Sequence, residues 1–193
     1  MKADRPPDTG ASVRGGRPER PPPEVEIGIE AEAPDWSRAL AGYEAVCRNA
    51  ALAALERAGG LRKLDGPIEV GLLLADDETV RELNRTWRGQ DKSTNVLSFP
   101  DGSDAPPGAP RMLGDIVLAY GTVAAEAEAQ GKALEHHLVH LVVHGMLHLL
   151  GYDHENDRGA EEMEGLETEI LAGFGIADPY EEAAVVRRDA ATR

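Results

Sequence analysis

The sequence of 193 residues contains a single cysteine, Cys47, and has no long hydrophobic run. One cysteine cannot form a disulfide within the chain, which fits a reducing compartment. The longest apolar stretch, residues 138–151, has 14 residues and includes three histidines, whereas a membrane helix needs about 20 apolar residues. The first 24 residues contain no apolar segment of the kind that directs secretion. These absences predict a cytoplasmic protein without a membrane span.

Basic residues are also scarce relative to acidic ones. Lysine and arginine together number 20, aspartate and glutamate 35, and the formal net charge is −15. This excess argues against a protein that holds nucleic acid mainly by long-range attraction, although it leaves room for a local basic site. The hydrophobic fraction of 41% and the charged fraction of 28% are typical of a globular protein. The length suits one domain with a sizeable core.

Composition divides the chain into three segments. Residues 1–24 hold six of the 13 prolines, several arginines and no apolar period, which predicts a disordered tail. A basic arm that contacts RNA is the alternative for this tail. Residues 25–182 carry the periodic hydrophobic pattern of one domain, and residues 183–193 are expected to form a flexible C-terminal end.

Hydrophobic periodicity and turn residues predict the secondary structure of the domain. Strands are expected at residues 25–29, 68–75, 96–99 and 113–120, and helices at residues 35–58, 76–87, 122–130, 134–150 and from about 156 onward. Because strands and helices do not alternate strictly, we expect an α+β fold with a small mixed sheet of about four strands packed against helices. Cys47 lies on an apolar helix stripe, which favours a buried thiol. The acidic side of the last helix is expected to face solvent.

All six histidines fall in one short segment. His140, His144 and His148 are four residues apart, so on a helix they form one column. Gly151 permits the left-handed turn that ends a helix, and His154 follows three residues later. His144, His148 and His154 thus have the spacing of the metzincin zinc ligands. Three imidazoles with an open fourth position are typical of a catalytic zinc site, so we predict one zinc ion per chain at these three residues.

The residue after the first predicted ligand distinguishes this chain from zinc peptidases. Those enzymes place a glutamate there as general base, whereas this chain has Gly145. A peptidase of the usual kind would lack the group that deprotonates its water, so a zinc peptidase is the weaker alternative. His137 and His140 are assigned to the core or to contacts that support the ligands.

Four sequence segments have distinctive composition. Residues 144–154 read His-Gly-Met-Leu-His-Leu-Leu-Gly-Tyr-Asp-His, and residues 83–100 run from Leu-Asn-Arg-Thr-Trp-Arg-Gly-Gln-Asp to Val-Leu-Ser-Phe-Pro. Residues 113–117 read Leu-Gly-Asp-Ile-Val, and residues 161–170 read Glu-Glu-Met-Glu-Gly-Leu-Glu-Thr-Glu-Ile. Together these segments resemble the YbeY family of bacterial metal-dependent endoribonucleases and ribosomal RNA maturation factors. The resemblance covers residues 25–182 and leaves out the N-terminal tail.

The resemblance implies a zincin-like α+β fold with the metal held by His144, His148 and His154. It implies an endoribonuclease that cleaves single-stranded RNA, processes the 3′ end of 16S ribosomal RNA and takes part in ribosome quality control in the cytoplasm. The implied partners are therefore ribosomal RNA, the small ribosomal subunit and its assembly factors. The functional arginine of the family falls on Arg88, so the catalytic residues implied are Arg88 and His144.

The residues around this arginine suggest how RNA is held. Arg81, Arg85, Arg88 and Lys92 recur at spacings of four, three and four, and they form a local basic strip if the helix extends far enough. Pairing of the first two with nearby glutamates is an equal alternative. A guanidinium at position 88 can stabilise the negative charge that builds on a phosphate in the transition state. Two roles are possible for Asp115: it orients a ligand, or it accepts hydrogen bonds from backbone groups.

The sequence also allows a second class of function. A non-catalytic ribosome-assembly factor could use zinc only to stabilise its fold. Such structural sites are closed by four protein ligands, and the histidine segment offers three. The absence of a fourth ligand therefore favours the enzyme.

Overall fold

The structure is a computed structural model that describes residues 23–59, 66–103, 106 and 109–180. The predicted tail, apart from residues 23 and 24, lies outside the described residues, as does the predicted C-terminal end at residues 183–193. Among the described helices, none has both the length and the apolar character needed to cross a membrane.

A four-stranded mixed sheet forms the centre of the fold. Its strands are β1 (Val25–Ala31), β2 (Ile68–Ala75), β3 (Val96–Pro100) and β4 (Arg111–Ala119). The order across the sheet is β1-β2-β4-β3, with β1, β2 and β4 parallel and β3 antiparallel to β4. The α+β class and the size of the sheet are confirmed. β3 is an edge strand, a position that bears on the functional site below.

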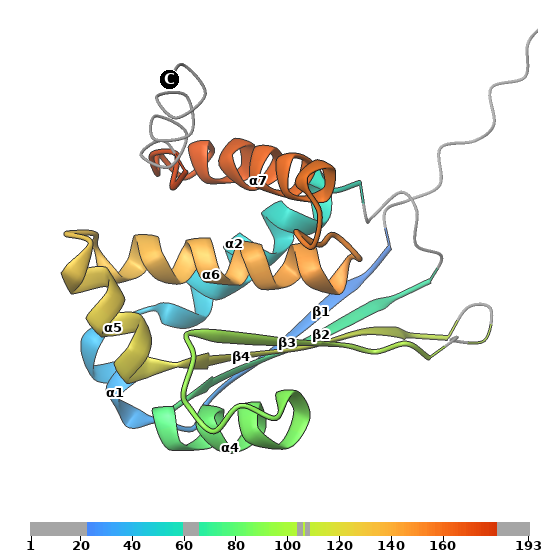
Figure 1. The fold of residues 1–193 in the computed structure, drawn as a ribbon. Helices are drawn as coiled ribbons and strands as arrows, with labels where there is room; N and C mark the ends of the chain where they lie inside the picture. The colour runs from blue at the N-terminus through green and yellow to red at the C-terminus, as the bar shows by residue number, and fades with distance from the viewer. Residues whose placement is uncertain (1–22, 60–65, 104–105, 107–108, 181–193) are drawn as a thin grey trace, which may run out of the picture.

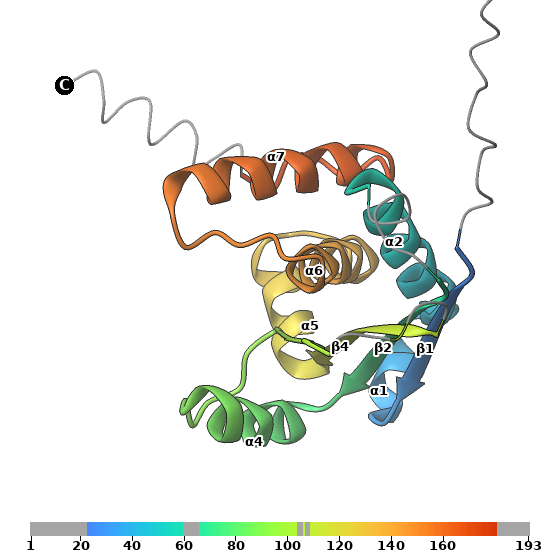
Figure 2. The same cartoon turned by 90° about the vertical axis from the view of Figure 1, so that its right-hand side faces the viewer.

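Helices lie on both sides of this sheet (Figures 1 and 2). One side carries α2, Tyr43–Arg57, and α6, Leu134–Leu149, with α7, Asp157–Ala172, stacked over α6. α5, Tyr120–Ala129, follows β4 directly and packs against α6. The opposite side carries α4, Asp77–Arg88. α6 therefore lies between the sheet and α7 and is covered by protein on several sides.

Strand alternation divides the core between the two sides of the sheet. On β2, Leu72 and Leu74 belong to the larger cluster shared with α2, α6 and α7, while Ala75 belongs to a small cluster under α4. Cys47 lies fully buried in the larger cluster, and burial raises the pKa of its thiol to about 12. The predicted buried thiol is confirmed.

The long helix predicted over residues 35–58 is wrong. The structure has two helices there, α1, Pro34–Ala39, and α2, separated by a turn at Gly42, whose φ is +80°. Trp36 explains the break, because its ring is fully buried and its indole N–H donates to the carbonyl of Ala75, 3.1 Å away. This contact directs α1 toward the end of β2, and the chain must turn before α2 can follow its own path.

Candidate metal centre

Helix α6 is almost entirely a core helix, and this fixes the position of its histidines. Ten of its 16 residues are buried, including Leu138, Val142 and Met146. His144 and His148 lie on the same helix but remain partly exposed. Because the apolar residues lock the rotation of α6 against the sheet and α7, the direction of the two imidazoles is set by packing.

The end of α6 brings a third histidine to the same place. The amide N–H of Gly151 donates to the carbonyl of His148 and that of Tyr152 donates to the carbonyl of Leu147, both at 3.0 Å. Gly151 has a φ of +89°, a conformation that favours glycine. The chain thus reverses at Gly151, and His154 returns to the end of the helix.

His144, His148 and His154 form one group. One ring nitrogen of each lies within 4.8 Å of those of the other two. The Nε2 atoms of His144 and His148 are 3.1 Å apart. Two nitrogens bound to one zinc ion at about 2.0–2.1 Å are separated by roughly 3.3 Å in tetrahedral geometry. The donor set and its spacing therefore fit a single divalent ion.

Each of the two helical histidines has an acceptor oxygen near its other nitrogen. Nδ1 of His148 lies 3.0 Å from the carbonyl oxygen of Tyr152, and Nδ1 of His144 lies 3.3 Å from Oε1 of Glu167. With Nδ1 protonated toward these acceptors, Nε2 carries the lone pair that a metal requires. Burial, together with the neighbouring His144, lowers the pKa of His148 and keeps it neutral, the form that binds metal.

Glu167 is a residue that the sequence analysis missed. It lies on α7, whose acidic side was expected to face solvent, yet its side chain is fully buried. Met163 and Leu171 stand four residues before and after it and are also buried, so Glu167 belongs to the apolar stripe of α7. That spacing was the available signal. Burial alone opposes its ionisation, but contacts with His140 and His144 outweigh this and lower the pKa of Glu167 to about 2.

Glu167 also contacts groups beyond the predicted triad. Its Oε1 lies 3.0 Å from Nε2 of His140, and the hydroxyl of Tyr180 donates to Oε2. Burial, together with the carboxylate of Glu167, raises the pKa of Tyr180, so this hydroxyl remains a donor. His137, by contrast, lies in the core, 2.8 Å from Glu126. The two histidines set aside from the triad therefore have separate carboxylate partners.

Gly145 faces the sheet. A Cβ atom there would lie 3.0 Å from two carbons of Ile116 and 3.1 Å from the hydroxyl oxygen of Ser98. A glutamate side chain would have to enter the packed space between α6 and strands β3 and β4. The position that supplies the general base in zinc peptidases is therefore a close helix–sheet contact in this chain, which argues further against a peptidase mechanism.

Arg88 lies at the end of α4, on the other side of the sheet from α6 (Figure 2). Its Nη2 donates to the carbonyl oxygen of Ser98 on edge strand β3, 3.1 Å away. The hydroxyl of Ser98 in turn donates to the carbonyl of Gly145, 3.4 Å away. The structure thus brings the three histidines together and connects Arg88 to their helix through Ser98, around the open edge of the sheet.

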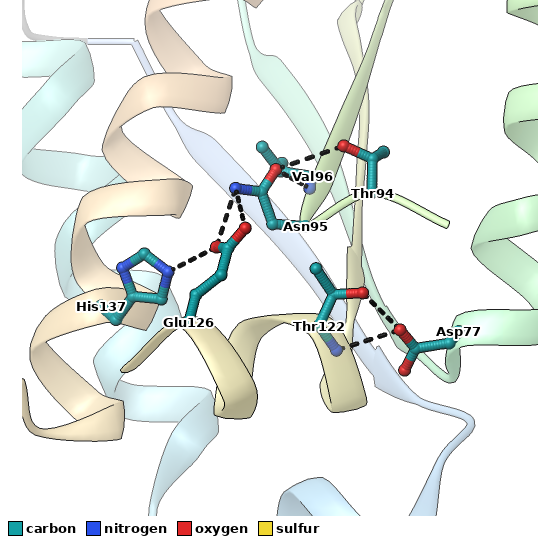
Figure 3. A network of polar contacts seen from close by, with 7 residues as sticks. All are labelled: Asp77, Thr94, Asn95, Val96, Thr122, Glu126 and His137. Atoms are coloured by element: carbon teal, nitrogen blue, oxygen red, sulfur yellow. Dashed lines mark hydrogen bonds and ion pairs between the residues drawn. The ribbon is translucent and has the colours of Figure 1, made fainter. Parts of the chain in front are cut away.

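The loop after Arg88 is held in place by a polar network, part of which Figure 3 shows. Asp77 accepts hydrogen bonds from the hydroxyl of Thr122 and, at 3.0 Å, from its backbone amide. Asn95 donates to Glu126 at 3.0 Å, and the same carboxylate meets His137. These contacts fasten the start of β3 to α4, α5 and α6. Ser93 donates to Asp77 at 3.1 Å, so Ser93 and Asn95 together position the strand that Arg88 contacts.

The predicted basic strip does not form as a strip. α4 ends at Arg88, and Gly89 follows with a φ of +69°, so Lys92 lies in the loop rather than on the helix. Arg81 is paired with Asp91, with N–O distances of 2.8 and 3.2 Å. The loop folds back along the helix and supplies this aspartate, a partner that spacing along the helix did not suggest.

Beside Arg88, a groove of about 1070 Å³ opens on the α4 side of the sheet. Trp87 and Phe99 line it, with ring centroids 6.1 Å apart, and Trp87 is 68% exposed. Asp115 faces this groove, and its carboxylate lies over Gly71, in space that a side chain would otherwise fill. Asp115 is thus a surface residue of the groove on the side of the sheet opposite α6.

The family profile and the curated relatives point to the same family. The family profile described as Endoribonuclease YbeY matches residues 39–175, more than half of the chain. An endoribonuclease YbeY of Paramagnetospirillum magneticum is 54% identical over 162 residues, covering 82% of this chain and 97% of that protein. One of Nitrobacter hamburgensis is 49% identical over 188 residues, covering 93% and 95%. A solution structure from Thermotoga maritima is 26% identical, with a TM-score of 0.49, and covers 76% of this chain and 86% of that one.

Proposed function

Since this chain belongs to the YbeY endoribonuclease family, we propose that it cleaves single-stranded RNA in ribosomal RNA maturation, with one zinc ion held by His144, His148 and His154. The observation that carries this proposal is the convergence of three ring nitrogens within 4.8 Å of one another. In the part of the chain that the structure describes, this group contains no fourth protein ligand. A site left open in this way is typical of catalytic zinc.

The three histidines and Arg88 have different roles in phosphodiester cleavage. A zinc ion held by the neutral imidazoles of His144, His148 and His154 would supply Lewis acidity toward a phosphoryl oxygen and would lower the pKa of a water. Arg88 binds the non-bridging phosphate oxygens, on which charge builds in the transition state. One of its donors holds Ser98, and the others have no hydrogen-bond partner among the described residues. The planar guanidinium of Arg88 can therefore keep its hydrogen bond to Ser98 and still contact a phosphate with two other donors.

The groove beside Arg88 takes part of the RNA strand. Trp87 offers an exposed ring on which a base can stack, an interaction typical of single-strand binding. The net charge of −15 means that RNA is not gathered by the surface as a whole. RNA is instead positioned locally, by Arg88, by this groove and by partners on the small ribosomal subunit. The substrate in the cytoplasm is then the 3′ end of 16S ribosomal RNA and the RNA of defective ribosomes.

The test combines metal analysis with RNA cleavage on the same preparations. Wild-type protein reconstituted with zinc should hold one ion per chain and cut a short single-stranded RNA. His144→Ala should lose both properties, whereas His136→Ala, an exposed histidine on the same helix, should keep both. The metal-free forms of all three proteins should unfold with similar midpoints.

Two results would contradict this proposal in different ways. Wild-type protein that holds no metal after reconstitution would remove the metal centre. A folded His144→Ala protein that still processes RNA would leave the metal with a structural role and would favour the assembly-factor alternative.

A further inference from the structure

Glu167 is an unusual residue to find at the centre of α7. A buried carboxylate is costly unless charged or hydrogen-bonding partners compensate it. An apolar side chain would suit the stripe formed by Met163 and Leu171 without that cost. The carboxylate therefore brings something other than packing to the contact between α6 and α7.

One oxygen of the carboxylate, Oε2, accepts a hydrogen bond, whereas Oε1 is buried without a hydrogen-bond partner among the described residues and lies beside a predicted metal ligand. Oε1 lies 3.3 Å from Nδ1 of His144 and 3.0 Å from Nε2 of His140. Oε2 accepts from the hydroxyl of Tyr180. The hydrogen bond from Tyr180 thus holds the carboxylate through Oε2, and Oε1 is left close to Nδ1 of His144, while Nε2 of His144 lies beside Nε2 of His148.

We propose that Glu167 is a positioning residue that holds His144 as the Nδ1–H tautomer and aims its Nε2 at the metal. This inference rests on the metal centre of the proposed function. A carboxylate that accepts from a ligating imidazole fixes the orientation of the ring and makes the other nitrogen a better donor. The Nε2 atom of His144 lies 3.1 Å from that of His148, as this arrangement requires.

The two helical ligands are supported unequally. Nδ1 of His148 faces the neutral carbonyl of Tyr152, which belongs to the turn that ends its own helix. Nδ1 of His144 faces a carboxylate that comes from a different helix. Hydrogen bonds to ionised acceptors are about twice as strong as those between neutral groups. Glu167 therefore makes the donor strength of His144 depend on the docking of α7, whereas His148 is set locally.

The first experiment measures zinc affinity by competition with a chromophoric chelator at pH 7.5. Glu167→Gln keeps the size of the side chain and removes its charge, and it should weaken zinc binding by about 10- to 100-fold. Glu162→Gln is the matched control, because Glu162 lies on the same helix and is exposed. Its affinity should equal that of the wild type. Unfolding of the metal-free proteins, followed in urea, reports any loss of structure separately from the loss of affinity.

The second experiment uses the wild-type protein and therefore does not depend on how a variant folds. Nitrogen-15 NMR of the histidine side chains, with and without zinc, should find Nδ1 of His144 protonated and Nε2 bound to the metal. A Glu167→Gln protein with wild-type zinc affinity would overturn the inference, and so would coordination of zinc through Nδ1 of His144. Wild-type protein that binds zinc but leaves RNA intact would refute the proposed function and leave the role of Glu167 standing.

Discussion

Replacement of Arg88 by alanine separates catalysis from stability in this fold. The structural cost is the part-buried hydrogen bond from Nη2 to the carbonyl of Ser98 on edge strand β3, at 3.1 Å. A bond of this kind contributes about 1 kcal/mol to the free energy of unfolding. The catalytic cost is larger, because loss of one donor that stabilises transition-state charge slows a reaction by about 100- to 1000-fold, or about 2.7–4 kcal/mol. Arg88→Ala should therefore remain folded, bind zinc normally and lose nearly all cleavage.

The assay is single-turnover cleavage of a short single-stranded RNA at saturating enzyme and at two salt concentrations. Arg85→Ala is the control, because Arg85 lies one turn earlier on α4 and is exposed. Its effect should be confined to RNA affinity and should fade at high salt. Arg88→Lys should restore little, since an ammonium cannot hold Ser98 and contact a phosphate through a planar fork.

The decisive result is the rate at saturation. If Arg88→Ala cleaves as fast as the wild type once RNA is saturating, then Arg88 contributes only to binding. The charge that builds on the phosphate would then have to be stabilised by other groups, and the proposed division of work between Arg88 and the metal centre would fail.

Four other outcomes are expected. Zinc affinity, measured by chelator competition, should fall below about pH 6, because protons compete for imidazoles whose reference pKa is about 6.5. His148→Ala should lower the zinc content found by elemental analysis far more than His140→Ala, because His140 acts through Glu167. Gly145→Ala should cost up to about 2 kcal/mol in urea unfolding, since crowding against Ile116 at 3.0 Å, typically about 1–3 kcal/mol, outweighs a helix-propensity gain of about 1 kcal/mol. Cys47 should react with a thiol reagent at pH 8 only as fast as the protein unfolds, because its thiol is buried with a pKa raised to about 12.

The parts of this protein that could be predicted from its sequence are those specified by local spacing. The alternation of Val25, Ile27 and Ile29 with polar or small residues identifies β1, because the strand turns this one face toward the core. The grouping of His144 with His148 follows from the helical repeat, and Gly151 indicates where the chain turns to bring in His154. These features depend on neighbours within a few residues.

The parts that could not be predicted depend on contacts between distant elements. The break between α1 and α2 follows from the docking of Trp36 on the carbonyl of Ala75, 39 residues away. The burial of Glu167 depends on which side of α7 meets α6. Because acidic residues surround Glu167 in the sequence, that side looks like one that faces solvent. The pairing of Arg81 with Asp91 requires a loop that folds back along its helix. In each case tertiary packing overrides the local pattern.

The enclosure of α6 between the sheet and α7 links metal retention to the exchange of backbone amides. A helix covered on several sides opens only when most of the domain unfolds, so the amides around His144 and His148 should exchange with solvent at the slowest rates in the molecule. An ion that binds only the folded chain raises the free energy of that opening by an amount that grows with the logarithm of its free concentration. Deuterium uptake along α6 would therefore measure the occupancy of the site, without any RNA present.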